Sequence, residues 1–222
     1  MSRYIFLFDL DSTVTKQEIL PTISKRLGIY ERMSELTEST MRGEIPFKQS
    51  FLQRVELLKD VPVSEVNEMV SRIQLNNHLV DFIQKNHDRC HIVTGNLDVW
   101  IDGVIRKLGM ERNTFCSKAI VKNDYIEDVF NIVDKNAVIG QMVLPFVAIG
   151  DGNNDAEMIE AAEVGIGYGG VREIAPAVLA CASHAIYDEE KLVEFLERLL
   201  RRRSERISFS YCIPYPTIWP SK

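Results

Sequence analysis

The chain has 222 residues, of which 45% are hydrophobic and 26% charged, as in globular proteins with a sizeable core. The formal net charge of −6 argues against non-specific nucleic-acid binding, because that activity needs a basic surface. Every apolar run is shorter than the roughly 18 residues that cross a membrane, so we expect neither a nucleic-acid nor a membrane partner.

The cysteines and the first residues indicate a compartment. The cysteines are scattered and form no CxxC pair: Cys90, Cys116, Cys181 and Cys212. This spacing is typical of free thiols in a reducing environment. Residues 1–8 are too short, and too soon followed by acidic residues, for a signal peptide. We therefore expect a cytoplasmic protein.

Short apolar runs that end in glycine or a small polar residue recur along the chain. The first, Tyr4–Phe8, is continuously apolar, as expected of a central strand covered on both faces. Runs of the same form follow at 90–95, 146–152 and 164–169. Helical patterns lie between them, and one of these is expected to end at Gly109. The alternation predicts an α/β fold built on a doubly wound parallel sheet.

Two segments depart from this alternation. Residues 17–72 have helical spacing and little strand signal, which predicts a small helical cap inserted after the first strand. Residues 119–133 place turn residues between β-prone flanks, which predicts a hairpin. The predicted organisation is a core of residues 1–16 and 73–203, a cap of residues 17–72 and a tail of residues 204–222.

The C-terminal part begins with a further short strand and a helix, for which Asp188 is the expected N-cap. The helix ends in an arginine-rich stretch, which we interpret as solvated cations at a helix C-terminus rather than as a nucleic-acid patch. The tail is rich in proline and aromatic residues, and a strap over its own domain or a loose end is its simplest interpretation.

Acidic and small polar residues follow three of the predicted strands at the same end. In chain order they are Asp9 and Asp11, then Thr94 and Gly95, then Asp151 with Asp155 one helical turn later. Each aspartate alone has a simpler explanation, because aspartates after strands often cap turns. Ligands of open parallel sheets, however, bind beyond the carboxyl ends of the strands. The sequence therefore predicts one site where these residues meet.

The residue types indicate a chemistry for that site. A carboxylate beside Mg²⁺ can attack phosphorus, and a second carboxyl group two residues on can protonate the leaving alcohol. Mg²⁺ prefers hard oxygen ligands, which offsets the crowding of the acids. The oxygens of a transferred phosphoryl group also need donors, and Lys135 in DKNA is the best lysine candidate.

The motifs DLDST, VTGN and GDGNND, together with Lys135, resemble the four motifs of haloacid dehalogenase superfamily phosphatases over roughly residues 3–200. The likeness is greatest to the phosphoserine phosphatase branch, because Glu18 lies nine residues after Asp9 and Arg54 lies in QSFLQRVELLKDVP. The resemblance implies a Rossmann-like haloacid dehalogenase fold. It also implies hydrolysis of O-phosphoserine or a similar amino-acid phosphate, with a place in serine biosynthesis.

The resemblance also implies a role for each matching residue. Asp9 would be the nucleophile and Asp11 the general acid and base. Mg²⁺ would be bound by Asp9, Asp151 and the backbone carbonyl of Asp11. The implied phosphate and substrate ligands are Thr94, Gly95, Lys135, Asn154, Glu18 and Arg54, with Asp155 in support. Glu18 would contact the ammonium group of the substrate, and Arg54 would contact its carboxylate.

Three departures from the family pattern leave the substrate open. Asn96 stands where many relatives have glycine, the segment from Lys135 to Asp151 is short, and the tail has no counterpart. The alternative substrates are phosphohomoserine, a sugar phosphate or a nucleotide. A second class of alternative is a regulatory protein with an idle site, against which the intact motif residues argue.

Overall fold

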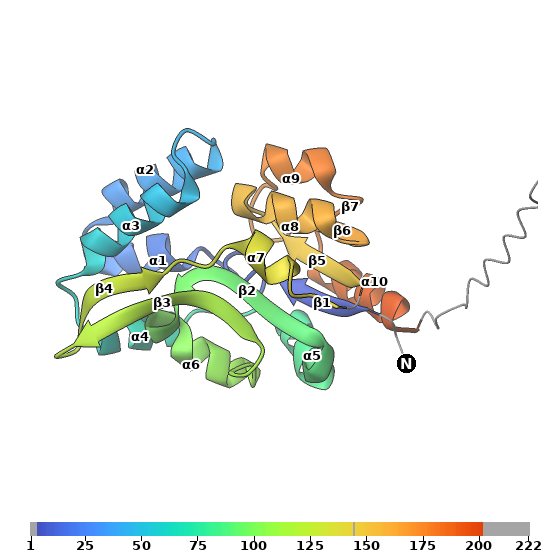
Figure 1. The fold of residues 1–222 in the computed structure, drawn as a ribbon, viewed down its shortest axis with the longest axis horizontal. Coiled ribbons are helices and arrows are strands. Elements are labelled where there is room, and N and C mark those ends of the chain that lie inside the picture. Colours follow the sequence, from blue (N-terminus) through green and yellow to red (C-terminus); the bar gives the residue numbers. More distant parts are fainter. Residues whose placement is uncertain (1–3, 144, 202–222) are drawn as a thin grey trace, which may run out of the picture.

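The computed structural model describes residues 4–143 and 145–201 (Figure 1). Its strands are β1 (Ile5–Phe8), β2 (Cys90–Leu97), β3 (Thr114–Lys122), β4 (Tyr125–Asn131), β5 (Phe146–Gly150), β6 (Val164–Tyr168) and β7 (His184–Ile186). They form a single sheet in the order β4-β3-β2-β1-β5-β6-β7. All neighbouring strands run parallel except β3 and β4, so the predicted doubly wound sheet is confirmed and has one antiparallel edge strand.

Helices cover both faces of the sheet. The helices that follow β1 directly are α1 (Ile19–Arg26), α2 (Tyr30–Met41), α3 (Phe47–Leu58) and α4 (Val63–Ser71). The remaining helices are α5 (Asn77–Lys85), η1 (His87–Arg89), α6 (Asp98–Leu108), α7 (Lys135–Ile139), η2 (Asn153–Asp155), α8 (Ala156–Ala161), α9 (Pro176–Cys181) and α10 (Glu189–Arg201). In Figure 1, α5 and α6 lie below the sheet, and α8 and α9 lie above it.

The central strand shows how the two layers are held together. Phe6 and Phe8 of β1 belong to the larger apolar cluster, whereas Leu7 between them belongs to the smaller one. All three side chains are fully buried. Because successive side chains of a strand point to opposite faces, a strand buried on both faces has to be continuously apolar. The apolar run before Asp9 is therefore explained by its central position.

The segment predicted as a cap is all-helical, with α1 to α4 in succession. The chain leaves and re-enters the core through two paired segments, joined by a bridge between Thr15 and Leu75. The Lys16 amide donates to the Gln74 carbonyl (2.8 Å), and the Asn76 amide donates to the Val14 carbonyl (2.9 Å). The division into a core and a cap of residues 17–72 remains a prediction. The last helix of this segment, α4, also packs against α6 of the predicted core.

That contact between α4 and α6 is close. The side-chain amide of Asn67 donates to the Val99 carbonyl (2.9 Å). A Cβ atom at Gly103 of α6 would lie 1.9 Å from the Ser71 hydroxyl oxygen. Glycine is therefore required at this position in the interior of α6, although it disfavours a helix elsewhere.

Several local predictions are confirmed. The hairpin is present as β3 and β4, with Asn123 and Asp124 at positive φ in its turn. α6 ends at Gly109, which has a φ of 69°. The Asp188 carboxylate accepts a hydrogen bond from the Lys191 amide (2.9 Å) at the start of α10, as an N-cap does.

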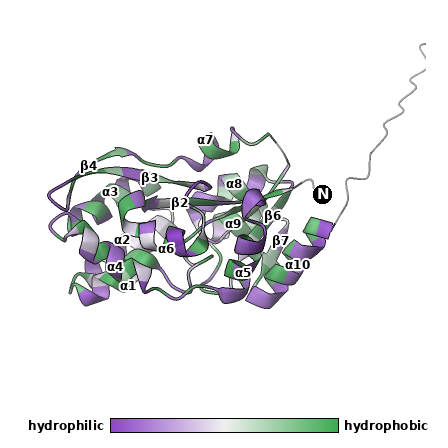
Figure 2. Ribbon diagram, turned by 90° about the horizontal axis from the view of Figure 1, so that it is seen from below, coloured by the Kyte–Doolittle hydropathy of each residue, from purple (hydrophilic) through white to green (hydrophobic). Residues whose placement is uncertain are grey.

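The predictions on the cysteines, the membrane and the tail can be compared only with the described residues. Within the described residues, Cys90, Cys116 and Cys181 are free thiols, and no helix is long and apolar enough to cross a membrane. Cys212, the tail of residues 204–222 and most of the arginine-rich stretch lie outside the described residues. Figure 2 shows hydrophobic residues on the sheet and on the inner sides of the helices, with hydrophilic residues on the outer turns of α10.

Candidate active site

The loop after β1 positions the first two aspartates. Its backbone continues the sheet for one more residue, because the Asp9 amide donates to the Ile149 carbonyl of β5 (2.9 Å). The chain then turns tightly at Ser12, which has a positive φ of 58° and donates its amide to the Thr15 hydroxyl (3.0 Å). This turn is buried, so Asp9 and Asp11 are held on a rigid support at the end of the central strand.

Asp11 is fixed by two donors. One carboxylate oxygen accepts the Ile19 amide at the start of α1 (2.6 Å), and the other accepts the side-chain amide of Asn96 (3.3 Å). Burial raises the pKa of Asp11, and the bond from Ile19 opposes that rise. A carboxyl group with a raised pKa is suited to hold a proton that it later donates.

Lys135 is buried between two carboxylates. Its ammonium group lies 2.6 Å from an oxygen of Asp9 and also contacts Asp155. Burial, followed by the charge of Asp155, raises the pKa of Asp9 to about 7, and Lys135 opposes that rise. Burial alone would lower the pKa of Lys135, but the charges of Asp155 and Asp9 raise it overall.

Asp155 also shapes the loop after β5. Its second oxygen accepts the amides of Asp151 (3.1 Å) and Gly152 (2.8 Å). A Cβ atom at Gly150 would lie 2.6 Å from the Asp155 carboxylate, so only glycine permits this close approach. The fold thereby directs the Asp151 side chain toward Asp9, and the supporting role predicted for Asp155 is consistent with these contacts.

Three carboxylates form a cluster with the chemistry of a cation site. Asp9, Asp151 and Asp155 are buried and each offers an oxygen within 4.8 Å of the other two. Burial and then the charge of Asp155 raise the pKa of Asp151 well above its usual value. Because Mg²⁺ takes oxygen ligands and would compensate this negative charge, the donors fit that cation. The Asp11 carboxylate is not in the cluster, and its predicted contribution is a backbone carbonyl.

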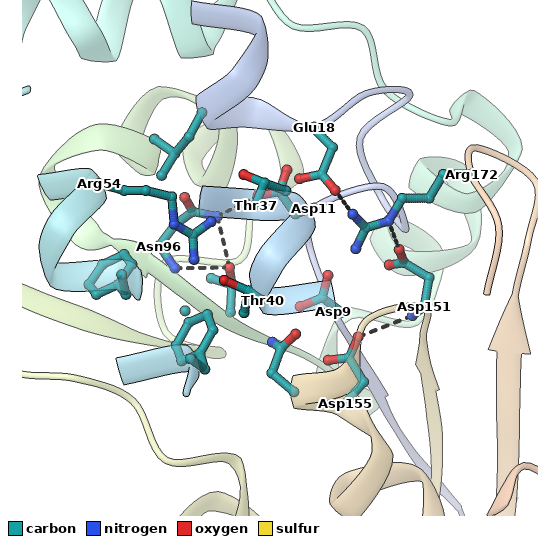
Figure 3. A pocket seen from close by; sticks show the side chains of 16 residues that line it. Asp9, Asp11, Glu18, Thr37, Thr40, Arg54, Asn96, Asp151, Asp155 and Arg172 are labelled. Atoms are coloured by element: carbon teal, nitrogen blue, oxygen red, sulfur yellow. Dashed lines mark hydrogen bonds and ion pairs between the residues drawn. The ribbon is translucent and has the colours of Figure 1, made fainter. Parts of the chain in front are cut away.

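The predicted substrate residues meet in one pocket (Figure 3). Its cavity has a volume of about 60 Å³. The lining combines the aspartates with Glu18, Arg54, Thr94, Gly95 and Asn154. Lys135 lies at the edge of this pocket, in an adjoining groove that shares Gly95 and Asn154 with it. The structure thus brings together every site residue that the sequence predicts, although the role of each stays a prediction.

Arg54 reaches the pocket from α3. The side chain is 8% exposed, and its guanidinium group lies 5.8 Å from the centre of the Phe47 ring. Its Nε atom donates to the Ser50 carbonyl (3.4 Å). Burial lowers the pKa of Arg54, and the charge of Asp11 opposes that change. The helical segment therefore supplies the pocket with a desolvated cation opposite the acidic rim of the sheet.

Asn96, the departure from the family pattern, has a defined place. Besides contacting Asp11, its side-chain amide donates to the Thr94 hydroxyl (3.1 Å). The side chain is buried and lines the pocket. Asn96 therefore joins the predicted general acid to the predicted phosphate-binding hydroxyl, which glycine does not do.

Sequence reasoning missed Arg172, which follows β6. Its guanidinium group contacts the carboxylates of both Glu18 and Asp151 (Figure 3). Arg172 could have been predicted from its position, because it follows YGG at the end of a fourth parallel strand. Ligands of open parallel sheets bind beyond the carboxyl ends of such strands. Other lining residues come from the helical segment and were also missed: Leu20, Thr37, Thr40, Phe47 and Phe51.

Comparisons with known proteins agree with this geometry. The model of the haloacid dehalogenase-like hydrolase family matches residues 6–160. The phosphoserine phosphatase of Methanocaldococcus jannaschii is 30% identical over 181 residues, which cover 75% of this chain and 85% of the relative. The phosphoserine phosphatase of Lactococcus lactis subsp. lactis is 27% identical over 211 residues, which cover 88% of this chain and 95% of the relative. A relative from Archaeoglobus fulgidus is 30% identical, and the match spans about half of its length (52%).

Solved structures of phosphoserine phosphatases are also similar to this chain. A phospho-aspartyl intermediate analogue of phosphoserine phosphatase has a TM-score of 0.73 at 27% identity, covering 88% of this chain and 99% of that one. A substrate-bound phosphoserine phosphatase has a TM-score of 0.73 at 27% identity, and the match covers 89% of this chain and 99% of that one. With this fold and these motif residues in one pocket, the chain belongs to the haloacid dehalogenase-like hydrolase family of enzymes.

Proposed function

We propose that this chain is a Mg²⁺-dependent phosphomonoesterase that acts on O-phosphoserine through an aspartyl-phosphate on Asp9. One observation carries the proposal: Asp9 and Asp11 line one small pocket, with the Lys135 ammonium group 2.6 Å from the Asp9 carboxylate. The relatives named above are phosphoserine phosphatases, which supports the choice of substrate.

The pocket residues have complementary tasks in this reaction. A carboxylate oxygen of Asp9 attacks phosphorus, and the ester bond to the serine oxygen breaks. Asp11 donates its proton to that oxygen, and serine leaves. Asp11 then takes a proton from a water molecule, which attacks phosphorus and releases Asp9 and inorganic phosphate. Lys135, the Thr94 hydroxyl and the Gly95 amide would bind the phosphate oxygens.

The metal site has a defined place in this scheme. Mg²⁺, bound by Asp9, Asp151 and the Asp11 carbonyl, would neutralise phosphate charge and lower the repulsion that a dianion meets near carboxylates. Asp155 would hold Lys135 and the loop after β5 in position, through the contacts described above. Asn154 would complete the phosphate side of the pocket.

The pocket favours a small zwitterionic substrate. Arg54 offers a planar guanidinium group that matches a carboxylate, and Glu18 offers a negative charge for an ammonium group. These charges favour an amino-acid phosphate over a sugar phosphate or a nucleotide, which do not carry an ammonium group beside a carboxylate.

Replacing the nucleophile tests the mechanism. Asp9→Asn keeps the size of the side chain and removes the attacking charge, so turnover of p-nitrophenyl phosphate should fall by several orders of magnitude. The assay is run with Mg²⁺ and with EDTA, and EDTA should abolish wild-type turnover. Activity of the variant near the wild-type level would rule out an aspartyl-phosphate on Asp9.

The substrate is tested separately with a panel of phosphomonoesters. We expect kcat/KM to be highest for O-phosphoserine, and lower for phosphohomoserine, a sugar phosphate and a nucleotide. A preference for any of the other compounds would replace O-phosphoserine in the proposal and leave the mechanism unchanged.

A further inference from the structure

Arg172 joins two parts of the protein that are far apart in sequence. It lies after β6, on the sheet side, and its guanidinium group contacts both Asp151 and Glu18. Asp151 belongs to the cluster of three carboxylates, and Glu18 is the N-cap residue of α1, the first helix of the helical segment. A single side chain therefore connects the predicted metal site to the entrance of the helical segment.

The charges of the pocket explain why Arg172 lies there. The lining contains five carboxylates, from Asp9, Asp11, Glu18, Asp151 and Asp155. The cations that face them are Arg54, Arg172 and Lys135. Lys135 contacts Asp9 and Asp155, and Arg54 has no ion pair of its own among the described residues. Of these three cations, Arg172 is thus the one that contacts Asp151.

A metal ion and this guanidinium group need the same carboxylate. The predicted Mg²⁺ ligands include Asp151, whose side chain is 1% exposed and contacts Arg172 through one oxygen. The other oxygen lies 3.4 Å from the Thr13 hydroxyl. Two cations in contact with one buried carboxylate repel each other strongly, because little water is present to screen them. Binding of the metal ion should therefore weaken the contact between Arg172 and Asp151.

We propose that Arg172 is a positioning residue that competes with the metal ion for Asp151 and, through Glu18, links metal binding to the helical segment. Without metal, Arg172 balances Asp151 and holds the carboxylate of Glu18. When metal binds, Arg172 moves away from Asp151 and its ion pair with Glu18 weakens. The Glu18 carboxylate then becomes available to the ammonium group of a substrate. The inference rests on the proposed function for the identity of the metal.

Thermodynamic linkage makes the competition measurable. If Arg172 occupies Asp151 in the metal-free protein, then removing the guanidinium group should strengthen metal binding. Titration calorimetry with Mg²⁺ alone should show the affinity of Arg172→Gln to be about tenfold higher than that of the wild type, a typical size for such coupling. Arg172→Lys, which keeps the charge without the planar fork, should lie between the two.

Two control variants distinguish loss of the contact between Arg172 and Asp151 from loss of a positive charge elsewhere near the pocket. Arg54→Gln removes a cation from the same pocket that has no ion pair with Asp151, and it should change Mg²⁺ affinity by less than about threefold. Arg42→Gln removes an exposed cation at an outer groove that also includes Arg172, and should leave the affinity unchanged. An equal gain in Arg54→Gln and Arg172→Gln would overturn the inference, as would weaker binding in Arg172→Gln.

Hydrogen exchange tests the link to the helical segment without any substrate. Mg²⁺ should change the exchange of the amides of α1 in the wild type, because the Glu18 contact changes. In Arg172→Gln the same amides should respond to Mg²⁺ much less. An equal response in both proteins would overturn the link. If the wild type hydrolyses p-nitrophenyl phosphate with Mg²⁺ but these results fail, only the inference is wrong; absence of Mg²⁺ binding in both proteins would overturn the proposed function as well.

Discussion

Asp9 and Asp11 are two residues apart, yet their environments differ. Burial raises the pKa of Asp9 to about 7, but the Lys135 ammonium group beside it opposes that rise and so favours the ionised carboxylate that a nucleophile needs. Burial raises the pKa of Asp11 as well, and this carboxylate accepts an amide from α1 and a side-chain amide from Asn96 instead of a lysine. Two identical side chains are thereby suited to different tasks, as in other enzymes that use paired carboxyl groups.

The division of labour between the two acids can be tested at Asp11. Asp11→Asn keeps the backbone carbonyl predicted to bind Mg²⁺, so Mg²⁺ affinity measured by calorimetry should stay near the wild-type value. Loss of the proton donor should lower kcat for O-phosphoserine by about 10²–10⁴. p-Nitrophenolate scarcely needs a proton to leave, so turnover of p-nitrophenyl phosphate should fall less. Equal losses for both substrates would contradict the assignment.

The charges that select the substrate can be tested at Arg54 and Glu18. Arg54→Ala removes a charge-assisted contact worth about 1.5–3 kcal/mol, or roughly 10- to 150-fold in kcat/KM for O-phosphoserine. Glu18→Gln should act in the same direction. p-Nitrophenyl phosphate has neither an ammonium nor a carboxylate group, so its kcat/KM should change much less.

Two other outcomes of that comparison have distinct meanings. A parallel fall for both substrates would show that Arg54 and Glu18 support closure or folding rather than selectivity. No change for either substrate would show that the physiological substrate is not an amino-acid phosphate. Both results would contradict the proposed roles of these residues.

At the scale of elements, the β3–β4 hairpin supports the helical segment as well as extending the sheet. Its turn residue Asp124 accepts the Ser64 amide (3.0 Å) and the Ser64 hydroxyl (2.5 Å) through its carboxylate. Its backbone carbonyl accepts the Val63 amide (2.7 Å). Pro62, the N-cap residue of α4, has no side-chain oxygen to offer. A residue from another element therefore caps α4.

Removing this cap should destabilise the protein. Asp124→Ala removes an acceptor and a negative charge from the N-terminus of α4 and places alanine at a positive φ, at a combined cost of at least about 1 kcal/mol in the free energy of unfolding. Asp124→Asn keeps an acceptor oxygen and should lose less. Urea denaturation of the three proteins measures the difference. Equal stability of Asp124→Ala and the wild type would show that the contact contributes nothing.

At the scale of the whole molecule, the site lies where the sheet and the helical segment meet. The loops and helical turns at the ends of the strands supply the aspartates and Lys135, and the helical segment supplies Arg54 and the aromatic side chains beside it. The two parts are joined by paired connecting segments, by the contact of α4 with α6, and by the contacts of Arg172. A ligand in the pocket therefore contacts both parts and should stabilise the whole chain.

Mg²⁺ should raise the stability of the folded protein, because it binds the folded cluster of carboxylates and not the unfolded chain. At a free concentration a hundredfold above Kd, the gain is about 2.7 kcal/mol. Thermal unfolding in MgCl₂ and in EDTA should show a rise in Tm for the wild type and for Asp60→Asn, an exposed control. Asp151→Asn should lose most of the rise. An equal rise in all three proteins would contradict the proposed metal site.

Local patterns in the sequence were enough to predict the main elements and most of the polar residues that line the pocket. Hydrophobic runs and helical spacing are local patterns, so they predicted the strands, the all-helical segment and the hairpin. The aspartates, Thr94 and Lys135 could be predicted because they follow strands or match short motifs, and parallel strands end at one edge of a sheet. The short segment before Asp151 corresponds to α7, which contains five residues.

Contacts between residues that are distant in the sequence could not be predicted from local patterns. The strand order places β1 between β2 and β5, and no local pattern specifies that order. The contacts of Arg172 with Glu18 and Asp151 depend on the loop after β6, the start of α1 and the loop after β5 all reaching one point. The cap of α4 likewise comes from the hairpin. Such contacts are set by packing between elements, whereas periodicity reports only which face of one element is buried.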